Sequence, residues 1–86
     1  MKNGLIILDD GDKRWYLNDK LHRKDGPAAE CTDGRKYWYL NGKLHREDGP
    51  AIEHTDGYKA WYYHGKYLKV SSLKEFRRLV DLSIFW

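Results

Sequence analysis

The chain has 86 residues, a formal net charge of +3 and 41% hydrophobic residues, which is the size and composition of one small globular domain. Its single cysteine, Cys31, excludes an intrachain disulfide and indicates a cytoplasmic protein rather than a secreted, disulfide-stapled one. The mild positive charge permits binding to nucleic acid or to an acidic protein and requires neither.

The first element in chain order is the apolar run Leu5-Ile6-Ile7-Leu8. This run is too short to span a bilayer or to form the apolar part of a signal peptide, so we expect no membrane association. We expect it to add an edge strand to a β-sheet.

Three tryptophans, Trp15, Trp38 and Trp61, follow at intervals of 23 residues, and the sequence around them repeats on the same period. Each tryptophan is preceded by an Asp-Gly pair and followed by a tyrosine, and the first two are also followed by Leu-His-Arg and Asp-Gly-Pro motifs. Because a stacked repeat buries its apolar face only against its neighbours, so short an array needs a cap at each end. The repeats cover about residues 10–32, 33–55 and 56–70, the last of which is partial.

Each repeat has the pattern of a strand, a turn and a second strand. In the second repeat, residues 35–40 alternate between two faces, Asn41-Gly42 is typical of a tight hairpin turn, and residues 50–54 are extended again. Residues 43–49 form either a short strand or a loop. The sequence therefore predicts a mainly β fold, an antiparallel meander of stacked β-hairpin repeats.

The alternation assigns the repeated aromatic residues to opposite faces of this sheet. We expect one face to be buried and to carry Trp15, Trp38 and Trp61 with Leu17, Leu40 and Tyr63. The opposite face carries Tyr16, Tyr39 and Tyr62.

From residue 71 the hydrophobic period changes to that of a helix. Ser72 and Glu75 form a capping-box signature, so we divide the chain into a β-repeat sheet over 1–70 and a capping or interaction helix over 71–86. The tail either wraps the end of the sheet or pairs with another molecule. The helix stripe comprises Leu73, Phe76, Leu79, Val80 and Ile84, and Leu82, Phe85 and Trp86 lie outside it.

The segments Trp38 to Arg46 and Glu47 to Glu53 resemble the membrane-occupation-and-recognition-nexus (MORN) repeats, in particular the divergent variants of bacterial and phage proteins. The resemblance covers Asp10 to about Leu68 and implies a fold of stacked hairpins with a binding role. One additional residue separates the tryptophan from the Asn-Gly turn, and Arg-Glu-Asp-Gly-Pro-Ala stands where Gly-x-Gly is typical. The lipid binding of some MORN proteins is therefore not carried over.

Two repeated sets of polar residues are candidate sites of chemistry. Glu30 and Glu53 recur as a carboxylate pair, expected about 9 to 10 Å apart, a separation that would allow acid and base catalysis. The simpler interpretation is that both face solvent beside lysine and arginine side chains. His22 and His45 are too far apart to share a zinc ion without distortion. We expect these histidines to brace Asp25 and Asp48 or a backbone carbonyl, and we expect no catalytic residue, metal site or cofactor.

The remaining repeated residues combine aromatic rings with cations. Such sets hold single-stranded nucleic acid by stacking and phosphate contacts, and tyrosine and arginine also dominate protein-binding hot spots. The predicted binding residues are Tyr16, Tyr39, Tyr62, Lys20, Lys43, Lys66, Arg23, Arg46, His22, His45, Phe85 and Trp86.

We therefore interpret the chain as a non-catalytic binding module. The family resemblance implies a phage-encoded accessory protein of the bacterial cytosol that binds and inhibits a host protein, such as a toxin or an antiviral defence factor. One alternative is an RNA-binding module that uses the same ladders. Another is a homo-oligomeric structural protein, for instance a homodimer joined through the C-terminal helix.

Overall fold

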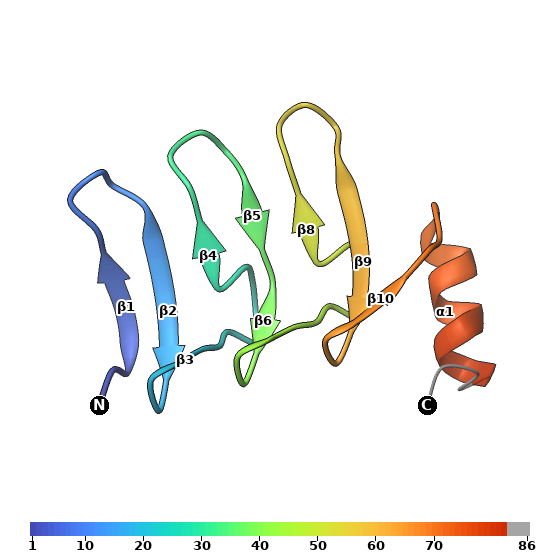
Figure 1. Cartoon of the computed structure of the whole chain (residues 1–86), viewed down its shortest axis with the longest axis horizontal. Coiled ribbons are helices and arrows are strands. Elements are labelled where there is room, and N and C mark those ends of the chain that lie inside the picture. The colour runs from blue at the N-terminus through green and yellow to red at the C-terminus, as the bar shows by residue number, and fades with distance from the viewer. Residues whose placement is uncertain (83–86) are drawn as a thin grey trace.

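The computed structural model describes residues 1–82, which form an antiparallel β-sheet followed by one C-terminal helix (Figure 1). The predicted fold class, mainly β with one C-terminal helix, is confirmed. The main sheet has the order β1-β2-β4-β5-β8-β9-β10, with β3 attached to β2, and β6 pairs separately with β7. The elements are β1 (Gly4–Ile7), β2 (Lys13–Leu17), β3 (Lys20–Leu21), β4 (Ala29–Glu30), β5 (Lys36–Tyr37), β6 (Tyr39–Leu40), β7 (Lys43–Leu44), β8 (Ile52–Glu53), β9 (Lys59–Tyr63), β10 (Lys66–Leu68) and α1 (Leu73–Leu82).

Tight turns at one end of the sheet join the longer strands to the short ones. Asn41 and Gly42 have φ angles of 50° and 81°, and His64 and Gly65 have 49° and 82°. Positive φ at both central residues is the geometry of the hairpin turn that matches the twist of the strands. The open question over residues 43–49 is resolved as the short strand β7 followed by a loop.

Neighbouring repeats are joined by backbone hydrogen bonds that recur at equivalent positions. The amide of Gly42 donates to the carbonyl of Leu21 and the amide of Gly65 to that of Leu44, both at 2.8 Å. At the N-terminal end, the carbonyl of Lys2 takes the same place and accepts from the amide of Asp19 at 3.0 Å. The predicted edge strand is confirmed as β1, which pairs with β2.

The strands lie in a single layer, and α1 stands beyond β10 at one end rather than over a face (Figure 1). The principal extents, 41 × 30 × 17 Å, agree with this flat shape. A fully buried Phe76 from α1 packs on Trp61 with 5.2 Å between ring centroids, and Leu68 completes this core. Within the described residues, no helix has the length and apolarity needed to cross a membrane.

The predicted capping box at the start of α1 is present. The amide of Glu75 donates to Ser72 Oγ at 3.2 Å, and the Glu75 carboxylate accepts in return from the hydroxyl groups of Ser71 and Ser72. In the predicted stripe Phe76 is buried and Leu79 and Val80 are half-buried, whereas Leu73 is 44% exposed. Ile84 lies outside the described residues.

The prediction of a uniformly buried tryptophan face is wrong for the first two repeats. Trp61 is 7% exposed, but Trp15 and Trp38 are half-buried and Leu17 is 42% exposed. The reason is that α1 reaches the sheet only at its last repeat. The first two tryptophans are covered by arginine side chains of their own repeats.

Candidate protein-binding face

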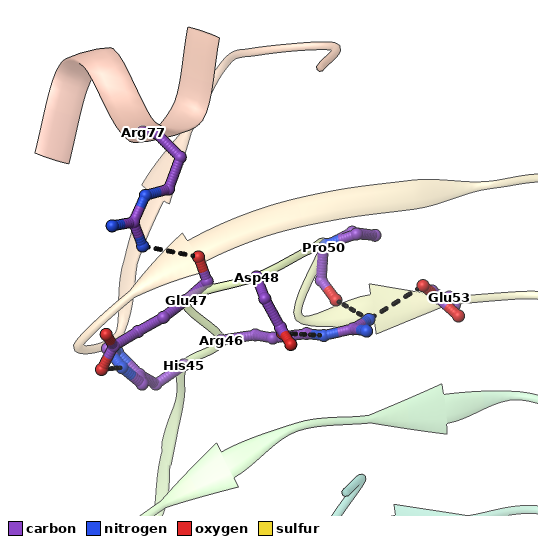
Figure 2. Close-up of polar contacts among 7 residues, drawn as sticks. All are labelled: His45, Arg46, Glu47, Asp48, Pro50, Glu53 and Arg77. Atoms are coloured by element: carbon purple, nitrogen blue, oxygen red, sulfur yellow. Dashed lines mark hydrogen bonds and ion pairs between the residues drawn. The ribbon is translucent and has the colours of Figure 1, made fainter. Parts of the chain in front are cut away.

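The guanidinium group of Arg46 lies over the Trp38 ring, with 3.8 Å between the guanidinium carbon and the ring centroid. Its Nε donates to Asp48 at 3.0 Å, and its Nη1 donates to the carbonyl of Pro50 at 3.1 Å and to Glu53 at 2.9 Å (Figure 2). A planar guanidinium can serve a ring and several acceptors at once, which an ammonium group cannot. The side chain of Arg46 is only 21% exposed.

Arg23 repeats this arrangement in the first repeat. Its guanidinium lies 3.9 Å from the Trp15 ring centroid and contacts Asp25 and the Pro27 carbonyl, both at 3.1 Å, while Glu30 is 3.7 Å away. The stacking faces and several donors of Arg23 and Arg46 are therefore used within the chain, and contact of these two residues with a partner stays a prediction. They act as covers for the tryptophans.

The predicted binding histidines also serve contacts within the chain. His22 Nδ1 accepts a hydrogen bond from the amide of Asn41 at 3.0 Å, and His45 Nδ1 accepts one from the amide of His64 at 2.8 Å. Each histidine thus joins its repeat to the turn of the next one. The expected partners, the carboxylates of Asp25 and Asp48, are bound to arginine instead.

His45 is 4% exposed, and burial lowers the pKa of its imidazole from the ordinary value. Glu47, whose Oε2 lies 3.3 Å from His45 Nε2, acts in the opposite direction and raises it. The carbonyl of Glu47 also accepts a hydrogen bond from Arg77 Nη1 at 3.1 Å, which ties α1 to this loop (Figure 2).

The repeated lysines lie on the same side of the sheet as the tryptophans. Lys20, Lys43 and Lys66 are exposed at the starts of β3, β7 and β10. They lie directly opposite Leu17, Leu40 and Tyr63, the residues two positions after each tryptophan. Residues in register share a face, so these lysines project away from the predicted tyrosine ladder. The sequence prediction of one combined aromatic and cationic surface is wrong.

The tyrosine ladder itself is present and larger than predicted. Tyr16 pairs with Leu21, Tyr39 with Leu44, and Tyr62 with Tyr67, so aromatic and aliphatic side chains follow one another across the sheet. Tyr37 lies on the same side two residues before Tyr39, and its partner is Ile52. We define the tyrosine face by Tyr16, Leu21, Tyr37, Tyr39, Leu44, Ile52, Tyr58, Tyr62 and Tyr67.

Tyr37, Tyr58 and Tyr67 are the tyrosines of this face that the sequence prediction did not include. The period-2 spacing of Tyr37 and Tyr39 was the available signal for the first of them. Tyr58 and Tyr67 have no tyrosine at the equivalent positions of the other repeats, so the repeat pattern gives no signal for them. Tyr58 joins the face through His54, whose ring lies 5.0 Å away, and His54 in turn is 3.3 Å from the Tyr37 hydroxyl.

Several rings of the tyrosine face are held in place by their neighbours. Tyr62 and Tyr67 lie 5.5 Å apart between centroids, and Tyr16 is capped by Lys2, whose Nζ is 5.0 Å from the ring centroid. Tyr58 and Tyr67 are 53% and 59% exposed. Burial is the main cause that raises the pKa of Tyr39 above the ordinary value of a phenol.

A cavity of about 310 Å³ opens in the middle of this face beside Tyr37 and Tyr39. Arg14 lines it and has one buried guanidinium nitrogen, Nη1, without a hydrogen-bond partner. A larger hollow of about 770 Å³ lies between the two arginine loops and includes Trp38. Its arginines are already bound within the chain, so it offers few unused donors.

No protein-family model, curated protein or solved structure matches the chain. The resemblance to MORN repeats thus remains an expectation from the motifs. The predicted binding residues Phe85 and Trp86 lie outside the described residues. Of the predicted set, Tyr16, Tyr39 and Tyr62 form one shared surface, and the lysines lie on the other side.

Proposed function

We propose that this chain is a non-catalytic module that binds another protein through its tyrosine face. The observation that carries the proposal is the placement of six of the seven tyrosines on one side of a single-layer sheet that no helix covers within residues 1–82. Tyrosine supplies a large amphipathic contact area with few torsions to restrict, and it is enriched at binding hot spots. Contacts between neighbouring rings lower the ordering cost of binding further.

The separation of aromatic residues from lysines favours a protein over RNA as the partner. Single-stranded RNA is held where bases stack on aromatics while nearby cations follow the phosphates. Here Lys20, Lys43 and Lys66 lie on the opposite side, and the stacked arginines are bound to their own carboxylates. The tyrosine face has Arg14 and Arg35 beside its central cavity, which is little positive charge for a phosphate backbone.

The biological setting that we propose comes from the resemblance of the repeats to small phage and bacterial proteins. The chain would occupy a host protein in the bacterial cytosol, such as a toxin or a defence factor, and block its function sterically. A broad face of tyrosine and aliphatic side chains suits the stoichiometric occupation of a protein surface.

The test is a comparison of baits in a nuclease-treated bacterial lysate. The variant Tyr58→Ser/Tyr67→Ser removes two exposed rings of the tyrosine face, and Leu17→Ser removes an exposed apolar residue of the opposite side as a matched control. We expect one stoichiometric protein band with the wild type and with Leu17→Ser, and its loss with the tyrosine variant. Circular dichroism verifies that all three proteins are folded.

Retention of the band by the tyrosine variant would remove this face from consideration. In a parallel pull-down from lysate without nuclease, material absorbing at 260 nm that nuclease removes and that moderate salt releases would instead support RNA binding, because phosphate contacts weaken steeply with ionic strength.

A further inference from the structure

The outer edge of β1 is an unpaired strand at one end of the sheet. We propose that it pairs, antiparallel and around a two-fold axis, with β1 of a second molecule of this chain. The strand order begins with β1, and β2 is its one neighbour among the described strands (Figure 1). At the opposite end of the sheet β10 is the last strand, and α1 stands beyond it (Figure 1).

The phase of the β1–β2 ladder shows which backbone groups point outward. The amide of Leu8 donates to the carbonyl of Asp12 at 2.8 Å, and Ile6 is in register with Arg14. Hydrogen-bonded and non-bonded pairs alternate in an antiparallel ladder, so Ile6 bonds to β2 while Leu5 and Ile7 direct their N–H and C=O groups to the open edge.

The amide of Trp15 verifies this phase independently. Trp15 stands opposite Leu5, and its N–H donates to the carbonyl of Ala28 at 2.8 Å, on the side away from β1. If Leu5 and Trp15 formed a hydrogen-bonded pair, the Trp15 amide would donate to the Leu5 carbonyl instead. The outward N–H and C=O groups of Leu5 and Ile7 are therefore a ready-made strand-pairing template.

The side chains of this edge lack the devices that normally prevent pairing. Leu5, Ile7 and Leu8 are 48%, 59% and 39% exposed, and residues 4–8 contain no charged residue and no proline. Exposed apolar edge strands that lack charges and prolines are prone to pair with another strand.

The edge is also complementary to itself. With Leu5 opposite Ile7 of the second molecule, the outward N–H and C=O groups of both strands meet, and Ile6 faces its own equivalent at the two-fold axis. Within β1 this register brings the exposed apolar side chains of Leu5 and Ile7 of one molecule against Ile7 and Leu5 of the other. This self-complementarity is the reason to assign the edge to a second copy of this chain.

This pairing would join two tyrosine faces into one surface. A two-fold axis normal to the sheet keeps both tyrosine faces on the same side, so the dimer would present two adjacent binding surfaces and gain avidity for a partner with repeated epitopes. The dimer itself does not depend on the proposed function, and its test uses no partner protein.

Sedimentation equilibrium over a wide concentration range tests the proposal. The wild type is expected to pass from 10.3 kDa, the mass of one chain, to twice that mass. Ile7→Lys places two ammonium groups beside the axis and is expected to weaken dimerisation at least ~100-fold, because like charges at an interface cost several kcal/mol. Leu82→Lys is the matched control, since Leu82 is 57% exposed on α1 and far from the edge.

Hydrogen exchange locates the interface at single residues. The amides of Leu5 and Ile7 are expected to be protected at high concentration and to exchange quickly on dilution, whereas the amide of Ile6 stays protected in both states. A wild type that remains monomeric up to millimolar concentration would overturn the proposal. It would equally be overturned by a dimer that survives Ile7→Lys, by one that Leu82→Lys dissociates, or by open-ended growth beyond two chains.

Discussion

Replacement of Arg46 by alanine should destabilise the fold rather than weaken the binding of a partner. The side chain covers the Trp38 ring at 3.8 Å and donates to the Pro50 carbonyl and to Glu53. Alanine removes all of these contacts and exposes the indole face to water, while Glu53 loses its closest cation.

The size of the effect follows from these three contacts. A stacked guanidinium contributes about 0.5–2 kcal/mol, and a hydrogen bond from a charged group to a buried carbonyl contributes about 1.5 kcal/mol. The ion pair with Glu53, whose side chain is 33% exposed, adds at most about 1 kcal/mol, and the bond to Asp48, which is 85% exposed, adds little. Because solvent replaces part of this, we expect a loss of about 2–3 kcal/mol, or about 10–20 °C in Tm for a domain of this size.

Urea unfolding monitored by tryptophan fluorescence measures this loss, and the first repeat supplies the internal comparison. Arg23→Ala should cost less than Arg46→Ala, because Arg23 lies 3.7 Å from Glu30 whereas Arg46 lies 2.9 Å from Glu53. Arg46→Lys should recover less than half of the lost stability, because an ammonium group cannot stack on the indole ring while it donates to both Pro50 and Glu53. A loss below about 0.5 kcal/mol for Arg46→Ala would refute this reasoning and favour a role of Arg46 in partner binding instead.

Three further predictions concern stability. Burial holds the pKa of His45 below its value in the unfolded chain, so folding favours the neutral imidazole. The contribution of His45 to stability should therefore be complete above about pH 6.5 and decrease as the pH falls below that value. Urea unfolding at pH 7 and pH 5 should show a smaller decrease in stability for His45→Gln than for the wild type. Gly57→Ala, at φ 94° with open space around it, should lower the free energy of unfolding by about 1–2 kcal/mol. Gly34→Ala, at φ 95°, should cost at least about 1 kcal/mol more, because Thr55 occupies the place of the new Cβ. Equal losses in denaturant unfolding would argue against this steric overlap with Thr55. Phe76→Ala should cost about 3–5 kcal/mol and abolish cooperative thermal unfolding by circular dichroism, whereas a Tm within a few degrees of the wild type would show that α1 is dispensable to the sheet.

The turns and the strand alternation could be read from the sequence because local chemistry determines them. Asn41-Gly42 adopts positive φ at both residues, which few other pairs tolerate, and the period-2 pattern around Trp38 and Tyr39 assigns each ring to a face whatever lies beyond it. The start of α1 was equally local, since the Ser72 and Glu75 side chains contact their own first turn.

The contacts of the predicted site residues could not be read from the sequence where they depend on long-range packing. An arginine after a histidine has the same local pattern whether it faces solvent or folds back over a ring eight residues earlier, as Arg46 does over Trp38. The sequence analysis also grouped the repeated lysines with the tyrosines because both recur in each repeat. The two-residue turn Asn41-Gly42 sets Lys43 opposite Leu40 and so puts it on the tryptophan side, a local signal that this grouping left out.

The third repeat explains why this array ends where it does. Arg46 and Glu53 have Lys69 and Phe76 at the positions 23 residues later, so the pair that covers a tryptophan by charge and stacking is absent there. The Phe76 ring supplies the cover for Trp61 instead, and it comes from a helix, which cannot offer strand hydrogen bonds to a fourth repeat. The same change of residues therefore buries the last tryptophan and closes one end of the sheet. The other end has only the apolar edge of β1, which is why association of two molecules is expected there.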